Sequence, residues 1–174
     1  MLIEFDGKRP KIGKDVFIAS TAVLIGDVTV GDNTSIWFSA VIRGDFGPIT
    51  IGAGCSIQDN VTIHVFDESP TIIHDNVTAG HGSVLEGCTI GRGTVVGMNA
   101  TVLPFAVVGE QVMIAAGCVI PERMVVPDRV LVAGVPAQVK KELSGTALRW
   151  IGRVSADYQR LQARYRAQGV MSGE

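Results

Sequence analysis

The sequence is poor in several residue types, and each shortage excludes a class of protein. Aromatic residues make up 6% of the 174 residues, and no apolar run reaches the length of a membrane span. The three cysteines lack CxxC spacing and are too few for a disulfide framework. A net charge of -2 argues against nucleic acid or an anionic membrane as the main partner. The N-terminus, MLIEFDGKRPK, has no apolar signal segment. We therefore expect a soluble, cytoplasmic protein with reduced thiols.

Glycine, by contrast, is abundant, and aliphatic residues recur with a period of six. The series runs through Ile12, Ile18, Leu24, Val30, Ile36 and Ile42, then Ile51, Ile57 and Ile63, then Ile73 and Ala79, and then Val84, Ile90, Val96, Val102, Val108, Ile114, Ile120, Val126 and Val132. This period fits neither an amphipathic helix nor an alternating strand. It predicts a parallel β-helix of hexapeptide repeats, in which each hexad forms one side of a prism and the aliphatic residues stack in the interior.

The cysteines follow the same repeat. Four positions after the aliphatic residue the side chain is usually small, and Cys55, Cys88 and Cys118 all stand there. We therefore interpret them as buried core residues and not as catalytic thiols.

A different pattern begins at Ser144. Apolar residues then follow at steps of three and four, and Gly169 ends the pattern, which predicts an amphipathic helix. Its arginines are interpreted as a solvated polar face. The sequence thus divides into a β-helix over residues 1–139 and a segment over residues 140–174 whose helix packs along it.

Interruptions of the repeat mark the places where loops leave the prism, and loops often carry function. Two interruptions insert residues: RGDFGP at residues 43–48 and HVFDESPTI at residues 64–72. A third shortens the step between Ala79 and Val84 by one residue. We expect the functional residues at these breaks.

With these repeats the sequence resembles the hexapeptide-repeat proteins, whose triangular, left-handed β-helix has three hexads per coil. On that arrangement one face carries a column of Arg43, Asp45, His64 and Glu86, and another face carries Gln58, Asp59 and His81. His81 and Glu86 can then share a ligand only when a neighbouring subunit brings its second face against the first, as in a cyclic trimer.

The elements Arg43-Gly44-Asp45, Gln58-Asp59-Asn60, His64 and Gly80-His81 are more specific. With VTAGHGSVLEGCTIG and AGVPAQ, they resemble the gamma-class carbonic anhydrases over nearly the whole chain. The resemblance implies a homotrimer that hydrates CO2 to bicarbonate and holds Zn²⁺, or alternatively Fe²⁺, between its subunits. His64 and His81 match two of the family's three histidine ligands.

The resemblance also implies roles for other residues. Arg43 and Asp45 would form an ion pair across the subunit boundary, and Gln58 and Asp59 would lie beside the metal-bound water. Tyr158 falls where relatives place a polar residue near the site, although simple packing of the helix explains it equally well.

Glu86 stands where the family has its third histidine. Two histidines and a carboxylate can bind zinc, and they also form the facial triad of non-haem iron. The carboxylate makes the metal less electrophilic, so bound water should lose its proton less readily. Phe46 replaces a glutamate of the archetypal enzyme, and the short insert offers only Asp67 and Glu68 as acids. We therefore expect CO2 hydration to be slow or absent.

Two other functions stay open. A coenzyme A-dependent acyltransferase, with His81 or His64 as general base, would share the repeat and the AGVPA ending. A non-enzymatic assembly or ligand-binding protein would keep the trimer while the metal site is lost, and Glu86 and Phe46 favour that interpretation.

Overall fold

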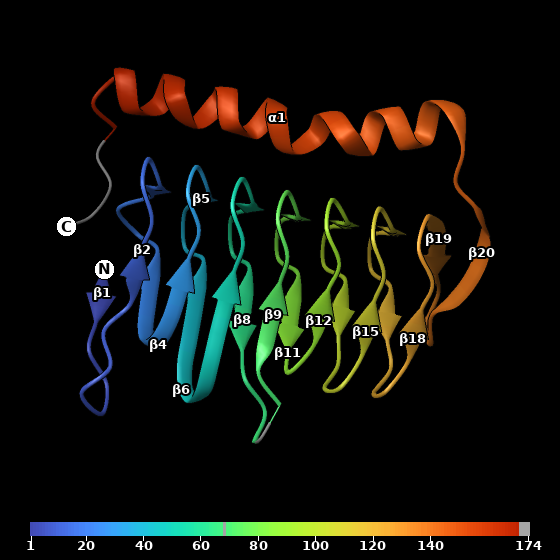
Figure 1. Cartoon of the computed structure of the whole chain (residues 1–174), viewed down its shortest axis with the longest axis horizontal. Coiled ribbons are helices and arrows are strands. Elements are labelled where there is room, and N and C mark those ends of the chain that lie inside the picture. The colour runs from blue at the N-terminus through green and yellow to red at the C-terminus, as the bar shows by residue number, and fades with distance from the viewer. Residues whose placement is uncertain (68, 171–174) are drawn as a thin grey trace.

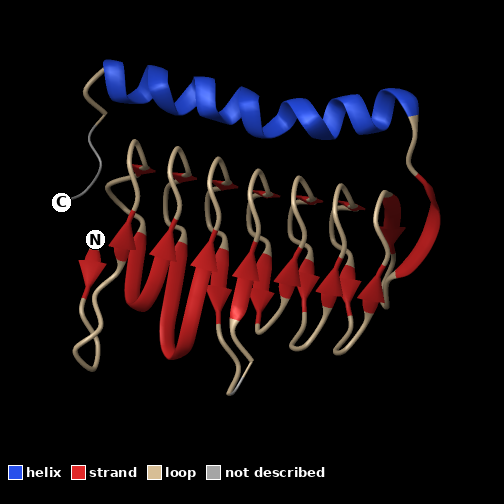
Figure 2. Cartoon of the chain, in the orientation of Figure 1, coloured by secondary structure: helices blue, strands red, loops and turns tan. Residues whose placement is uncertain are grey.

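The computed structural model describes residues 1–67 and 69–170. Its architecture is the expected all-β solenoid of hexapeptide coils with one C-terminal helix. The helix α1 (Gly145–Ala167) runs back along the whole solenoid, from the last coil to the first (Figure 1; Figure 2). No helix in this part of the chain is long and apolar enough to span a membrane.

Parallel strands stack into three faces. The first face contains β1 (Leu2–Ile3), the starts of β4 (Val23–Val30) and β6 (Val41–Ile51), β8 (Thr62–His64), β11 (Val84–Glu86), β14 (Thr101–Val102) and β17 (Val119–Ile120). The second contains β2 (Lys11–Ile12), the ends of β4 and β6, β9 (Thr71–Ile73), β12 (Thr89–Ile90), β15 (Val107–Val108) and β18 (Val125–Val126). The long strands β4 and β6 continue around the corner between these two faces, so both belong to one sheet.

The third face is a separate sheet. It contains β3 (Phe17–Ile18), β5 (Ser35–Ile36), β7 (Ser56–Ile57), β10 (Thr78–Ala79), β13 (Val95–Val96), β16 (Met113–Ile114), β19 (Val130–Ala133) and β20 (Gln138–Glu142). The last of these strands pairs antiparallel with β19, and it runs across the expected division at residues 139 and 140.

The interior is a continuous stack of aliphatic side chains. From Ile18 to Val132 the expected positions are at most 5% exposed, with one exception. Val84 is 36% exposed, and Leu85 takes the interior position between Ile63 and Val102. The expected short step between Ala79 and Val84 is therefore wrong. The short step lies between Leu85 and Ile90, because the periodicity could not choose between two adjacent aliphatic residues.

The three cysteines are confirmed as buried, unpaired thiols. Burial raises the pKa of Cys55 and of Cys88 to about 12, and it also raises the pKa of Cys118. A thiol that holds its proton so firmly is a poor nucleophile at neutral pH.

Helix α1 follows the N-cap Ser144 as predicted, and its apolar stripe covers the third face. Its residues Tyr158 and Tyr165 pack edge-on against Trp37, whose indole N–H donates to the hydroxyls of Ser35 and Ser56. This cluster fixes the position of Tyr158 relative to the third face.

Side-chain amides attach α1 to successive coils. Gln159 donates to the backbone carbonyl of Gly54 at 3.2 Å, and Gln162 donates to that of Asn33 at 3.0 Å. Three helical residues rise about 4.5 Å, close to the spacing of about 4.8 Å between adjacent strands. The helix repeat therefore matches the coil repeat, which keeps α1 parallel to the prism axis.

Candidate functional site

The residues expected in one column do lie together on the first face. Arg43, His64 and Glu86 are register partners on β6, β8 and β11. Each follows an interior residue, so its side chain points outward from the prism. This stacking places a guanidinium, an imidazole and a carboxylate on adjacent coils.

His64 lies between two carboxylates. Its Nδ1 is 3.0 Å from Oε1 of Glu86, and its Nε2 is 3.0 Å from Oδ1 of Asp45. The ring also meets the edge of Phe46, with ring centroids 5.8 Å apart. Both nitrogens of this imidazole are therefore engaged, and the carboxylate of Glu86 faces the ring directly.

Asp45 holds the other end of this chain of contacts. Burial opposes its ionisation, but hydrogen bonds from His64 and Arg43 outweigh burial and lower the pKa of Asp45. The side chain is thus a carboxylate at neutral pH and accepts from both neighbours. Within the chain Arg43 pairs with Asp45 itself; a pair across a subunit boundary stays a prediction.

The second column lies on the third face, as expected. The Nδ1 of His81 is 2.8 Å from Oδ2 of Asp59, and its backbone N–H donates to Oε1 of Gln58 at 3.1 Å. His81 is exposed on the corner after β10, whereas Gln58 is buried. His81 therefore has a carboxylate on one ring nitrogen, whereas His64 has one on each.

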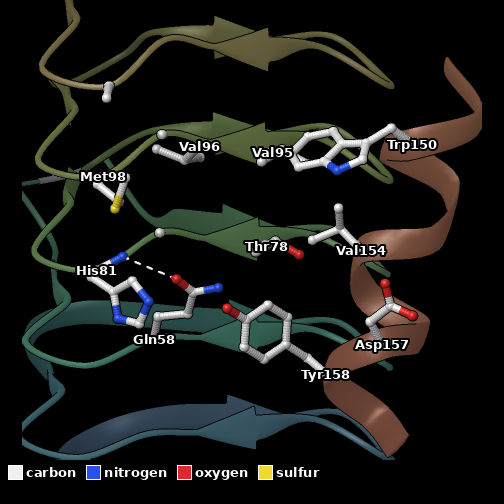
Figure 3. Close-up of a pocket in the computed structure, with 13 residues that line it drawn as sticks. Gln58, Thr78, His81, Val95, Val96, Met98, Trp150, Val154, Asp157 and Tyr158 are labelled. Carbon is white, nitrogen blue, oxygen red and sulfur yellow. Dashed lines mark hydrogen bonds between the residues drawn. The ribbon is translucent and has the colours of Figure 1, made fainter. Parts of the chain in front are cut away.

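A cavity of about 410 Å³ opens beside His81, between the third face and α1. In Figure 3, Gln58 lies between His81 and Tyr158 at one end, and Trp150 lies beside Val95 at the other. Burial, and after it the negative charge of Asp59, raises the pKa of Tyr158. Tyr158 therefore keeps its hydroxyl proton at neutral pH, and it both packs on Trp37 and lines the cavity.

A second cavity, of about 320 Å³, lies beside His64 on the first face. Phe46 and Phe66 form apolar walls, and Asp67 and Glu86 supply carboxylates. Glu68, the other acid expected near here, lies outside the described residues.

The donors of one chain do not converge on a single point. Among the described residues no group of three or more His, Cys, Asp and Glu side chains could hold a metal ion. His64 and Glu86 do fit as a pair, because two ligands at about 2.1 Å from one ion lie roughly 3 to 3.4 Å apart. His81 lies on another face, so one chain offers two of the three donors at one place.

Sequence reasoning missed several members of the site. The contacts of Asp45 with His64 and of Asp59 with His81 depend on side-chain directions that the repeat does not encode. Phe66 and Trp150 were not singled out. Phe66 lies two residues after His64, a proximity that could have found it, whereas no local signal marks Trp150.

Comparisons with known proteins agree with this fold. The family profile described as GMPPB C-terminal domain matches residues 44–140, and that of bacterial transferase hexapeptide (six repeats) matches residues 9–44. A solved structure of a hexapeptide transferase family protein from Anaplasma phagocytophilum superposes with a TM-score of 0.92 at 35% identity, covering 95% of this chain and 98% of that one.

Two relatives belong to the protein class that the motifs indicate. The chain is 37% identical to gamma carbonic anhydrase 2, mitochondrial, of Arabidopsis thaliana over 96% of its length, and it spans 62% of that plant protein. It is also 37% identical to a carbonic anhydrase of Geobacillus kaustophilus, over 96% of this chain and 92% of that protein.

Proposed function

This chain belongs to the gamma carbonic anhydrase-like family of hexapeptide-repeat proteins, and on that premise we propose a homotrimer with a divalent metal at each subunit boundary. His64 and Glu86 of one copy and His81 of another would hold the ion, Zn²⁺ or alternatively Fe²⁺. The reaction would be slow, reversible hydration of CO2 to bicarbonate.

The observation that carries this proposal is the separation of 3.0 Å between Nδ1 of His64 and Oε1 of Glu86. That separation suits two ligands of one ion, and Asp45 holds the opposite ring nitrogen. A histidine that donates its other N–H to a carboxylate keeps one tautomer and one ring orientation, which is how ligand histidines are usually supported. Asp59 is placed to support His81 in the same way.

The chain's own residues then divide the work. A bound divalent metal would supply the lowered pKa of a coordinated water, which is the source of the nucleophile in CO2 hydration. Gln58 accepts from the backbone of His81, so its amide N–H groups remain to orient a polar substrate. Tyr158, protonated at neutral pH, offers a hydroxyl donor in the same cavity.

Proton export is the weak step. Both candidate ligand histidines are held by carboxylates, so neither ring is free to relay a proton to solvent. Asp67 is the exposed carboxyl group that lines the cavity beside His64, and among the described residues this cavity offers no further histidine that could carry a proton to solvent. This arrangement supports slow turnover.

The test is the metal content per subunit, measured by mass spectrometry on protein purified anaerobically. We compare the native protein with Glu86→His, Glu86→Gln and His64→Ala, and the control is His74→Ala, which removes the third histidine outside both columns. Native protein and control should hold about one metal per subunit and elute as trimers, and His64→Ala should lose the metal. Glu86→His should keep the metal and hydrate CO2 at least about tenfold faster.

If the native protein forms a trimer without metal, and Glu86→His binds the metal, then Glu86 prevents metal binding at this site. A native protein whose metal content is the same in His64→Ala would overturn the assignment of the ligands.

Acyl transfer from coenzyme A is the second candidate, because a solved relative is described as a hexapeptide transferase family protein. A rise in the melting temperature with acetyl-CoA, absent in His81→Ala, would support it. No shift at millimolar acetyl-CoA would reject it.

A further inference from the structure

The cavity beside His81 is larger than CO2 hydration requires. Its lining spans four coils, from Gln58 through Thr78 and Val95 to Ala116, which corresponds to a length of roughly 14 Å. A three-atom substrate would leave most of its 410 Å³ unfilled. We propose that this cavity binds acyl compounds, with a neutral ester or amide carbonyl at the His81 end and an unbranched apolar tail along α1. The inference goes beyond the proposed function, since it assigns a class of ligand to the cavity beside the same site.

The two ends of the cavity differ in chemistry. At one end, Gln58 and Tyr158 present an amide and a hydroxyl beside His81 (Figure 3). An amide N–H and a phenol O–H are donors, and a carbonyl oxygen is the acceptor that both can share. The other end is apolar, because Val95, Val154 and Trp150 line it.

The apolar wall is built by one stripe of α1. Trp150, Val154 and Tyr158 follow at steps of four residues, so they lie one above another on the side of the helix that faces the third face. Trp150 is nevertheless 50% exposed, which is unusual for a large apolar residue on a packed helix. A tail lying between Trp150 and Val95 would cover this ring.

The opposite wall includes two small residues, Gly97 and Ala116, beside Val96 and Met98. A side chain at Gly97 would meet the backbone nitrogen of Ala116 at 2.5 Å, so only glycine fits there. Ala116 itself is exposed and carries a single methyl group into the cavity. Packing between coils therefore keeps the cavity open at this level.

Charge selects a neutral head group. Asp59 lies close enough to raise the pKa of Tyr158, and Asp157 also lines the cavity, although it pairs with Arg160. A carboxylate head would be repelled by Asp59 unless a metal offsets that charge. A neutral carbonyl meets the donors without this penalty.

Trp150 offers a direct readout. The sequence has only one other tryptophan, Trp37, and it is 4% exposed and buried under α1. We titrate the full-length protein as purified, and again after removal of metal by a chelator, with N-methyl alkanamides from acetamide to octanamide. Quenching of tryptophan fluorescence by iodide reports whether Trp150 is covered. Alkanoates of the same lengths test the head group.

The dissociation constant of the amides should fall about fourfold per added methylene until the cavity is full, which is the gain for burying one methylene. Protection of Trp150 from iodide should rise in parallel. In Ala116→Leu, the gain in affinity per methylene should stop at a shorter amide. Val107→Leu, a smaller enlargement at an exposed position on the second face, should leave the series unchanged. Alkanoates should bind only to metal-loaded protein.

Two results would overturn the inference: affinities that do not depend on chain length, or a series that Ala116→Leu leaves unchanged. Failure of the metal proposal would give a different set of results. In that case the protein would hold no metal and alkanoates would never bind, but the neutral amides would still show the chain-length series. If instead the cavity proposal fails, metal content and the slow hydration of CO2 would remain while the amide series is flat.

Discussion

His64 and Glu86 lie side by side on adjacent coils although 22 residues separate them, with Nδ1 of the ring 3.0 Å from Oε1 of the carboxylate. On the opposite side of the ring, Asp45 engages Nε2 at the same distance. Glu86 is therefore not an isolated side chain. It belongs to a linked carboxylate, imidazole and carboxylate on one face of the solenoid.

The role of Asp45 as the residue that orients His64 can be tested with Asp45→Asn. Loss of the carboxylate on Nε2 should weaken metal binding by about 10- to 100-fold. A competition titration of zinc against a fluorescent chelator measures this change. Asp27→Asn removes another carboxylate that pairs with a surface cation, Lys8, and should leave the affinity unaltered. Equal affinities for the native protein and Asp45→Asn would remove Asp45 from the site.

The cysteines should not react in the native protein. Burial raises the pKa of Cys55 and Cys88 to about 12, so their thiolates are scarce at neutral pH and also inaccessible. A colorimetric thiol reagent should detect none of them in the folded protein and all three after denaturation. Rapid modification of one thiol under native conditions would show that a coil opens locally.

The pKa of Tyr158 makes stability depend on pH at the alkaline end. Burial and Asp59 raise this pKa above the ordinary value of about 10. Below that ordinary value both the folded and the unfolded chain hold the proton. As pH rises above it, the unfolded chain ionises first, so the contribution of Tyr158 to stability is lost as pH rises through the folded pKa.

Tyr158→Phe should remove this dependence. We expect the native protein to lose stability relative to Tyr158→Phe as the pH rises above about 10, and urea unfolding at several pH values measures the difference. The ultraviolet absorbance of tyrosinate should show one delayed step that the variant lacks. A constant difference in stability across this range would contradict the expected shift.

Gly87 and Gly117 test the packing at the shortened step. Both have a positive φ, +54° at Gly87 and +66° at Gly117. An added Cβ at Gly87 would lie 3.1 Å from that of Phe66 and 3.2 Å from that of Ser69, whereas at Gly117 nothing lies within 4 Å. Gly117→Ala should cost about 1 kcal/mol from the backbone alone, and Gly87→Ala about 2 to 3 kcal/mol because crowding adds to it.

Denaturant unfolding of the two glycine variants gives the comparison. Because the backbone cost is shared, the difference between them reports the crowding at the corner between β11 and β12. Equal losses would mean that the loop carrying Phe66 moves away freely.

Much of the fold could be predicted from the sequence. The six-residue period identifies the interior position in every hexad except one, where Val84 and Leu85 are adjacent and equally apolar. The columns of the candidate site followed from the repeat together with the three hexads per coil that the resemblance implies, since inserting or deleting residues at corners leaves the register of the strands intact. The direction of each side chain within a column did not follow, because it depends on which groups the neighbouring coils present.

By itself, the sequence determined the solenoid, its buried cysteines, the closing helix and the placement of Arg43, His64 and Glu86 on one face. These features repeat along the chain, so a local pattern is enough to specify them. Only the tertiary structure decided that Asp45 and Glu86 hold His64 between them, and that a long cavity separates His81 from Trp150. Both depend on the meeting of distant segments, adjacent coils in one case and α1 with the third face in the other, and no local pattern encodes such a meeting.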